Sequence, residues 1–438
     1  MVSRSFVLEG RLNKRRLKKS INFVVNLHER LRTKATKIGD TYVEEIVPKV
    51  EVRLIYKDVS THGEIKAMAR AEALYKKVCL GGMNLQVLPL IETQLLKLAN
   101  QRHFFIFTIN HGIADAVALE LLFKQISQTY TELTQGLAPS LCPPRFSFRQ
   151  YYNAYEAWLA GDNRKRLENY WKKETRDIHR YQFPFEKKQY SASRVNYSCM
   201  ETYCFKDDWK NRITTFCMTQ GVSKFVFLLA IVQVMIYRYL GNSVVFVSSA
   251  TDTRKTPEEA EIVGDLGCSI YIKQRLKVTG SFTDLVNRLR AKVYEVIENN
   301  ILGSPRLGSW VPNDEAPGAK AVHQINVMKT PETGDKLEFP GICTTPVNRR
   351  IRPASTKLNL VLCESKEDLT LALHYPPDIF VKHGIERMFF NLQWFMSIAL
   401  ESPQLRLNRF PDLRDRKSIR GPLTREESAL TLLDRIDT

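Results

Sequence analysis

Residues 103–123, HFFIFTINHGIADAVALELLF, form the stretch that decides the fold. Six almost wholly apolar residues, 104–109, are followed by His111, and four positions later Asp115 opens a segment with helical spacing. A strand this apolar must be covered on both faces, so its end is expected to deliver His111 to the rim of a sheet. Because ligands and reacting groups gather at such rims, the sequence predicts a candidate site at this turn.

The size and charge of the chain limit its class. The 438 residues, 44% of them hydrophobic, exceed the ~250–300 at which one core usually stops growing. We therefore expect a mixed α and β protein with an N-terminal lobe at 1–180, a C-terminal lobe at 181–410 and a polar tail or linker at 411–438. The net charge of +18 favours acidic or phosphate-bearing partners. The basic residues are spread along the chain without a nucleic-acid motif, so nucleic acid is not an expected partner.

Several classes of site and location are not expected. The eight cysteines show neither Cys-x-x-Cys pairs nor zinc spacing, which predicts reduced thiols and no metal site. No apolar run reaches the ~20 residues of a membrane span, and the N-terminus lacks the pattern of a secretory signal. These features predict a cytoplasmic protein without a membrane partner.

Periodicity predicts the other elements. One apolar face at three- and four-residue spacing indicates a helix over 12–31. The Pro-rich segment 137–146 interrupts the chain before an aromatic helix pair that turns at Gly161. Later elements are a buried helix at 225–240, strands at 244–250 and 269–276, a helix capped by Ser281, and loop-rich sequence at 303–356.

The turn after the apolar strand supports two interpretations. In the first, Asp115 is only a helix N-cap, worth ~1 kcal/mol, and His111 is a partly buried polar group. In the second, a neutral imidazole at His111 accepts a proton from an attacking amine or hydroxyl. The small residues Gly112, Ala114 and Ala116 would let a substrate backbone or thioester arm approach, which points to acyl transfer without a covalent enzyme intermediate.

NHGIADA at 110–116 resembles the HHxxxDG signature of the condensation domains of nonribosomal peptide synthetases, which share a fold with chloramphenicol acetyltransferase. Further segments are similar to motifs of that family, and the likeness runs from about residue 8 to 410. They are LHERLRT at 27–33 (family HExLRT), VLPLIET at 87–93, the helix pair that starts with FRQYYNAYEAWL, the helix and strand at 221–254, and IVGDLGCSIYIKQRL at 262–276.

The resemblance implies an α/β (α+β) fold of two chloramphenicol-acetyltransferase-like lobes in a V-shape, with a tunnel where donor thioester and acceptor meet. His111 matches the catalytic histidine. Asp115 matches a structural aspartate, expected to pair with Arg32 through a bidentate ion pair, and Asn110 stands in place of the first histidine as a supporting residue. Residues expected to line the tunnel are Gly112, Ala116, Ser269 and Asn326.

The implied activity is that of an acyltransferase of nonribosomal peptide and antibiotic biosynthesis. An acyl or peptidyl group on the phosphopantetheine arm of a carrier protein would pass to an amine or hydroxyl of a small-molecule or carrier-bound acceptor, giving an amide or ester. His111 would deprotonate the nucleophile or stabilise the tetrahedral intermediate. The enzyme itself needs no bound cofactor, since the arm comes with the carrier or with CoA. Two alternatives remain: an acyl-CoA-dependent O- or N-acyltransferase of the same fold, and a catalytically degenerate domain that only docks carriers.

Some positions depart from the family pattern. Asn110 replaces a histidine and keeps only hydrogen bonding, and Ala116 replaces a glycine, which requires a negative φ. Lys357 stands where the family prefers aspartate. The chain also enters directly at FVLEGRLN, without the strand and the glutamine-containing helix that usually precede this point in the family, so part of one tunnel wall is expected to be missing or supplied otherwise. DLGCSI at 265–270 looks like the phosphopantetheine-accepting serine motif of carrier proteins, but the alternation that follows it indicates a strand, which argues against carrier function.

Overall fold

The structure is a computed structural model that divides into two compact units. It describes residues 1–176, 178, 181–188, 197–205, 208–300, 325–330, 336–347, 351–354, 356–365 and 369–414. Unit 1 comprises Met1–Arg164, Asp252–Gly267 and Thr333–Pro353, and unit 2 comprises Lys165–Thr251, Cys268–Glu332 and Ala354–Thr438. The single boundary predicted at residue 180 is therefore wrong. Two late segments pack with the N-terminal part, and long-range packing of this kind leaves no trace in local sequence patterns.

Unit 1 is built on a five-stranded sheet with the order β11-β1-β6-β5-β4. All neighbouring pairs are antiparallel except β4 and β5, which are parallel. The strands are β1 Val2–Gly10, β4 Leu54–Asp58, β5 Ile91–Ala99, β6 Arg102–Ile109 and β11 Ile342–Pro346. The apolar stretch that was predicted to be a buried strand is β6, at the centre of this sheet.

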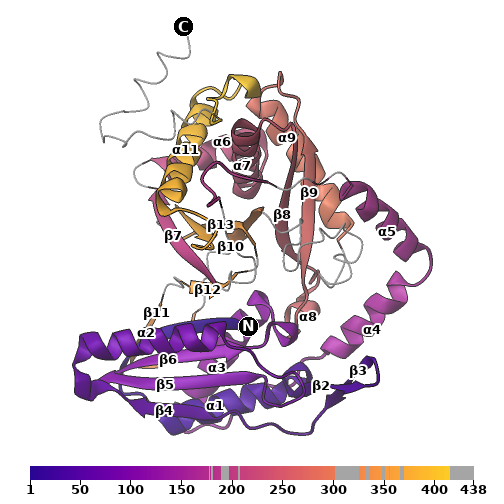
Figure 1. Cartoon of the computed structure of the whole chain (residues 1–438). Helices are drawn as coiled ribbons and strands as arrows, with labels where there is room; N and C mark the ends of the chain where they lie inside the picture. Colours follow the sequence, from indigo (N-terminus) through magenta and orange to yellow (C-terminus); the bar gives the residue numbers. More distant parts are fainter. Residues whose placement is uncertain are drawn as a thin grey trace. The chain divides into compact units, whose positions relative to one another are not determined.

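Both faces of β6 are covered, as its sequence predicts. Phe105 and Phe107 pack into one core with helices α1 (Lys14–Leu27) and α3 (Ala116–Thr134). Phe104 and Ile106 point to the other face and pack against α2 (Glu64–Leu80). Figure 1 shows α2 and the pair α1 and α3 on opposite sides of the sheet. The alternation of side chains along a strand therefore places two core layers around one apolar segment.

The predicted helix over 12–31 is shorter than its periodicity suggests. Helix α1 ends at Leu27 because His28 adopts an extended conformation, with φ −104° and ψ 120°. The chain then makes the 3₁₀ turn η1, Glu29–Arg32, and enters an antiparallel hairpin of β2 (Thr33–Ile38) and β3 (Thr41–Ile46). The aromatic helix pair is present as α4 (Phe148–Leu159) and α5 (Asp162–Glu174). The short helix α8 (Pro257–Ala260) and strand β12 (Ile351–Pro353) also belong to unit 1, whereas α5 belongs to unit 2 from Lys165 onward.

Unit 2 contains a sheet whose strands run in the order β7-β14-β13-β10-β8-β9. These strands are β7 Tyr197–Phe205, β8 Val244–Asp252, β9 Gly267–Arg275, β10 Ile325–Thr330, β13 Leu358–Glu364 and β14 Leu369–Tyr375. Its helices are α6 Trp209–Gln220, α7 Lys224–Leu240, α9 Phe282–Glu298 and α11 Lys382–Glu401. The predicted buried helix is α7, and Ser281 caps α9 with a capping box. Ser269 lies within β9, so the serine motif of a carrier protein is absent here.

The segment predicted as loop-rich, 303–356, includes strands β10, β11 and β12 in its described part, while 301–324 lies outside the described residues. The predicted tail also lies outside them from residue 415 onward. In the part of the chain that the structure describes, no single helix is long and apolar enough to cross a membrane; α6 and α7 pass that test only together, as a pair bent by 98°. The same residues contain no group of three or more metal-ligating side chains.

Candidate functional site

The loop between β6 and α3 is a tightly bonded turn. Strand β6 ends at Ile109, and the side chain of Asn110 accepts a hydrogen bond from the backbone N–H of Gly112 at 2.9 Å. His111 opens the 3₁₀ turn η3, His111–Ile113. Helix α3 begins at Ala116, so this residue has the negative φ that its methyl group requires. Asn110 therefore supports the turn by accepting this hydrogen bond through its side-chain amide oxygen, and the turn does not need a histidine at this position.

Asp115 fixes the turn through four hydrogen bonds. Its carboxylate caps α3 by accepting the N–H of Ala118 at 2.8 Å, and it also accepts the N–H of Leu266 at 2.9 Å. The guanidinium of Arg254 donates to both carboxylate oxygens, at 2.8 and 3.3 Å. The carboxylate is buried, and the side chain of Arg254 is 3% exposed. Burial lowers the pKa of Arg254, but the carboxylates of Asp115 and Asp252 outweigh this effect and raise it above its ordinary value.

The predicted pairing of Asp115 with Arg32 is wrong. Arg32 donates instead to the carbonyl oxygens of Val47 and Pro48, just after the β2–β3 hairpin. Arg32 belongs to the turn η1, and its guanidinium ties that turn to the exit of the hairpin rather than to the carboxylate. Arg254 occupies the place that the motif-based prediction gave to Arg32.

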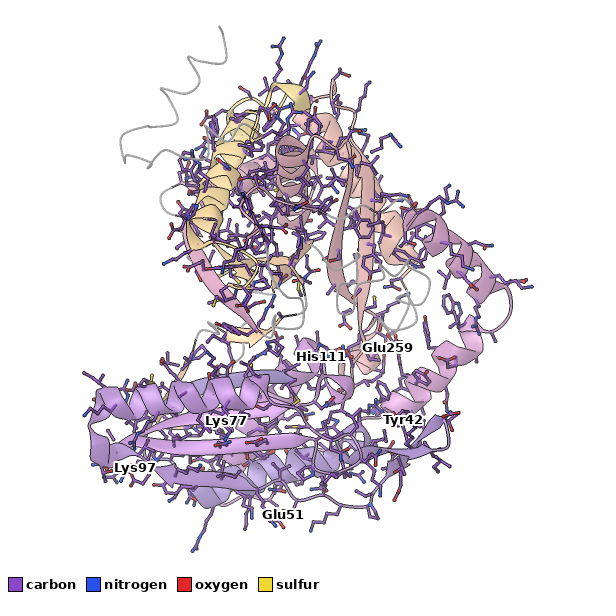
Figure 2. All side chains as sticks on the ribbon, in the orientation of Figure 1. Tyr42, Glu51, Lys77, Lys97, His111 and Glu259 are labelled. Carbon is purple, nitrogen blue, oxygen red and sulfur yellow. The ribbon has the colours of Figure 1, made fainter. Side chains whose placement is uncertain are left out.

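His111 lies just beyond the end of β6 (Figure 2). Its side chain is 57% exposed, and its Nδ1 lies 3.4 Å from a carboxylate oxygen of Asp265. The hydrogen bond to Asp265 raises the pKa of His111, partial burial opposes the rise, and the negative charge of Asp265 adds to it. An Nδ1–H directed at a carboxylate leaves the lone pair of Nε2 available to take a proton from a bound molecule.

Two residues of this site were not predicted as site residues. Arg254 ends the helix-and-strand segment that resembles the family, but no role followed from that likeness. Asp265 lies in DLGCSI, the segment that looks like a carrier motif, and that likeness gives the aspartate no role at His111. Both come from the segment Asp252–Gly267, which packs with unit 1 although Arg254 lies 139 positions after Asp115 in the sequence. The sequence offers two signals for these residues: the short polar segment TDTR, which ends at Arg254, and the position of Asp265 between two glycines. Neither signal specifies which residue would be the partner.

The expected tunnel-lining residues fall in different units. Gly112 and Ala116 flank His111 and Asp115 in unit 1, whereas Ser269 on β9 and Asn326 on β10 belong to unit 2. The amide of Asn326 accepts a hydrogen bond from Ser248 at 3.2 Å and donates to Asn359 at 2.8 Å. A tunnel between the lobes, with these residues in its wall, remains a prediction.

The departure at Lys357 has its own local partners. Its ammonium group donates to both carboxylate oxygens of Glu186 at 2.9 Å and to the carbonyl oxygen of Tyr181 at 2.8 Å. The Lys357 and Glu186 side chains are 14% and 5% exposed. Lysine is therefore satisfied within unit 2 where the family prefers aspartate.

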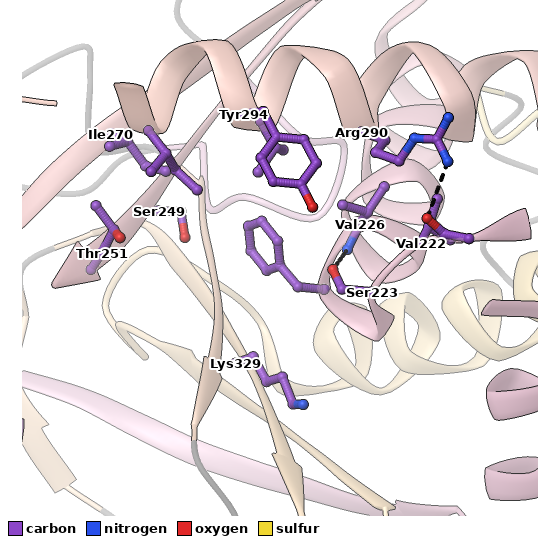
Figure 3. Close-up of a pocket in the computed structure, with 14 residues that line it drawn as sticks. Val222, Ser223, Val226, Ser249, Thr251, Ile270, Arg290, Tyr294 and Lys329 are labelled. Atoms are coloured by element: carbon purple, nitrogen blue, oxygen red, sulfur yellow. Dashed lines mark hydrogen bonds between the residues drawn. The ribbon is translucent and has the colours of Figure 1, made fainter. Parts of the chain in front are cut away.

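Unit 2 also has a half-open cavity of about 310 Å³ beside the N-terminus of α7 (Figure 3). Its wall includes Tyr294 of α9, Ser249 and Thr251 of β8, and Lys329 of β10. Arg290 donates a hydrogen bond at 3.2 Å to the carbonyl oxygen of Gly221, the residue that caps the C-terminus of α6. This cavity contains neither Ser269 nor Asn326 among its described lining residues.

Comparison with known proteins finds relatives that match nearly the whole chain. Chondramide synthase cmdD of Chondromyces crocatus is 22% identical over 98% of the chain, and tyrocidine synthase 2 of Brevibacillus parabrevis is 22% identical over 91%. The chain spans only 11% of the length of each of these two relatives.

Solved structures share the fold. The X-domain from teicoplanin biosynthesis matches with a TM-score of 0.81 at 18% identity, covering 94% of this chain and 93% of that chain. The first condensation domain of the calcium-dependent antibiotic synthetase, in complex with a substrate analogue, matches with a TM-score of 0.73 at 15% identity and the same coverage. The mixed α/β architecture of these neighbours confirms the predicted fold class. The model of the family described as "Condensation domain" matches residues 1–418, and the chain therefore belongs to the condensation-domain family.

Proposed function

We propose that the chain catalyses amide or ester formation from an acyl or peptidyl thioester, with His111 as the proton-accepting group. One observation carries the proposal: an exposed imidazole is oriented through Nδ1 by Asp265, in a turn anchored by the buried pair of Asp115 and Arg254. An oriented imidazole on an exposed side chain is suited to general base catalysis near neutral pH.

In the proposed reaction the nitrogen or oxygen of the acceptor attacks the thioester carbonyl carbon. A C–N or C–O bond forms, the C–S bond breaks, and the proton of the nucleophile passes through Nε2 of His111 to the departing thiolate. No covalent enzyme intermediate and no bound cofactor is needed, because the phosphopantetheine arm arrives with the donor. Proton transfer of this kind contributes about 10²–10⁴-fold, and positioning of the two substrates supplies the rest.

The proposed donor is an acyl group on a carrier protein. Support comes from family membership and from the net charge of +18, which attracts acidic proteins at long range. CoA carries the same arm and thioester, and a starter condensation domain of rhizomide synthetase has been solved in complex with C8-CoA. The experiment below therefore compares the two donors.

The test is to incubate the chain with an amine and either an acylated carrier protein or the matching acyl-CoA, and to follow the product and the intact carrier by mass spectrometry. We expect product from the acyl-carrier at a rate that falls at least ~10²-fold in His111→Ala. His383→Ala, which removes an exposed histidine of α11 in unit 2, is the matched control and should keep the wild-type rate. Product from acyl-CoA but not from the acyl-carrier protein would show that CoA, not a carrier protein, is the donor. Equal rates in wild type and His111→Ala would refute the role of His111.

A second candidate is a domain that binds carrier proteins without catalysis. It is favoured by Asn110, whose side chain accepts from Gly112 and cannot titrate where the family has a histidine. An X-domain of this fold from teicoplanin biosynthesis has been solved in complex with OxyB. Under this alternative, His111→Ala would bind an acidic carrier as tightly as wild type and neither protein would form product.

A further inference from the structure

Arg30 contacts the loop that carries His111. It lies in the turn η1, and its side chain is 13% exposed. One guanidinium nitrogen donates to the carbonyl oxygen of Gly112 at 2.9 Å, and another lies 2.6 Å from a carboxylate oxygen of Glu44 on β3. The guanidinium carbon lies 4.4 Å from the centre of the Phe148 ring on α4. Arg30 therefore joins η1, the hairpin and α4 to the residue that follows His111.

Phe148 contacts the segment that carries Asp265. A Cβ atom added to Gly264 would lie only 2.2 Å from the ring of Phe148, so the ring packs directly on the backbone at this position. The carbonyl oxygen of Gly264 accepts the N–H of Asp115 at 3.2 Å and a guanidinium N–H of Arg254 at 3.2 Å. The next residue, Asp265, is the partner of His111.

We infer that Arg30 and Phe148 form a clamp that holds the loop of His111 at a fixed distance from the segment of Asp265. Arg30 holds the first loop through Gly112, and Phe148 is packed between the guanidinium of Arg30 and Gly264 of the second segment. Arg30 is thus a positioning residue for His111. It occupies the variable position of the HExLRT pattern, and neither the motif nor the family match gives it this role.

Arginine suits this position because its planar fork donates in two directions while its face stacks on an aromatic ring. Lysine would retain one donor but would lose the fork and the stacking. A cavity of about 520 Å³ borders Arg30, Glu44 and Phe148, so a shortened side chain would leave space into which the ring and the turn could relax. Loss of the guanidinium should therefore lengthen the contact between His111 and Asp265.

The direct test is the titration of His111 by NMR in the full chain labelled at the histidine Cε1 positions. The chain has eight histidines, and the His111 resonance is assigned by its absence in His111→Ala. We expect Arg30→Ala to lower the pKa of His111 by about half a pH unit or more, with a smaller change in Arg30→Lys. Phe148→Leu, which keeps an apolar side chain but removes the ring, should change the pKa in the same direction. It also provides a test if Arg30→Ala does not fold.

Arg32→Ala is the matched control, because Arg32 lies in the same turn but donates to the carbonyl oxygens of Val47 and Pro48, whereas Arg30 donates to that of Gly112. It should lower the free energy of unfolding and leave the pKa of His111 unchanged. A wild-type titration in folded Arg30→Ala, or an equal shift in Arg32→Ala, would overturn the inference.

The kinetic consequence rests on the proposed function. Misplaced groups slow chemistry more than substrate binding, so Arg30→Ala should lower kcat by about 10- to 100-fold with KM within about twofold of wild type. A changed titration of His111 in a protein without acyltransfer activity would refute the proposed function and support the clamp. Normal activity and an unchanged titration in Arg30→Ala would refute the clamp alone.

Discussion

The carboxylate of Asp115 and the guanidinium of Arg254, 139 positions apart in the chain, form a buried two-point ion pair. The pair connects the start of α3 to the segment Asp252–Gly267 and thereby brings His111 and Asp265 to the same place. A buried charge left without its partner is costly, because it has given up its hydration and keeps no compensating charge. The stability of this turn and its chemistry therefore depend on the same contact.

Asp115→Ala should lower the free energy of unfolding by about 3–5 kcal/mol, since it removes one of the two carboxylates that pair with the buried guanidinium of Arg254 and also removes the cap of α3. Lys97→Ala is the control, since it breaks the ion pair of Lys97 with Asp58 at 2.9 Å, in which both side chains are partly exposed. Figure 2 labels Lys97 on unit 1. That loss should be much smaller than the loss in Asp115→Ala, because solvent screens an exposed pair. Denaturant unfolding gives the free energy of unfolding of both variants. Equal losses would show that the buried pair contributes no more to stability than the exposed pair.

Asp265→Asn should move the acidic limb of the pH profile of kcat/KM to lower pH. The hydrogen bond and charge of Asp265 raise the pKa of His111, and only the neutral imidazole can accept a proton, so the pair restricts activity to higher pH. Rates measured from about pH 5 to 8 would show the shift. The pair stabilises the fold only while His111 is protonated, and this contribution is lost as the pH rises through the raised pKa. A profile that did not move would exclude Asp265 as the group that sets the pKa.

His28 should make the protein less stable in weak acid. Its side chain is 2% exposed, and burial lowers its pKa despite a 2.7 Å contact between Nε2 and the side-chain oxygen of Gln125. Below the ordinary histidine pKa of about 6.5 the unfolded chain binds a proton that the folded chain resists, so stability falls there by up to about 1.4 kcal/mol per pH unit. Urea unfolding at several pH values should give a smaller acid loss for His28→Gln than for wild type. Parallel losses would mean that His28 is charged in the folded protein.

Gly264→Ala should destabilise unit 1 by about 1–3 kcal/mol, because its methyl group would overlap the ring of Phe148. Combining it with Phe148→Leu should cost less than the sum of the two single changes, since the smaller side chain makes room for the methyl group. Thermal or urea unfolding of the four proteins gives the coupling. Strict additivity would mean that the ring and Gly264 do not press on each other in solution.

Incubation with CoA and a phosphopantetheinyl transferase should leave the mass of this chain unchanged. Ser269 lies within strand β9 and does not begin a helix, which the serine motif of a carrier protein requires. Intact-protein mass spectrometry, with a true carrier protein as the positive control, checks this expectation. Addition of the arm at Ser269 would contradict the strand assignment.

The sequence by itself determined the elements whose signal is local. The run FFIFTI predicted a strand covered on both faces, the apolar segment at 225–240 predicted a buried helix, and Asp115 predicted an N-cap, because periodicity and capping act over a few residues. The HxxxD spacing also selected His111 and the family.

Tertiary structure decided which residues surround His111. Arg254 rather than Arg32 binds Asp115, and Asp265 contacts the imidazole. Arg30 donates a hydrogen bond to the carbonyl oxygen of Gly112 in the same loop. These contacts join segments that lie more than eighty positions apart, and each partner is an ordinary charged residue in its own neighbourhood. Only the packing of the chain brings them within hydrogen-bonding distance. A buried charge needs a partner, and the tertiary structure decides which charged residue lies close enough to be that partner.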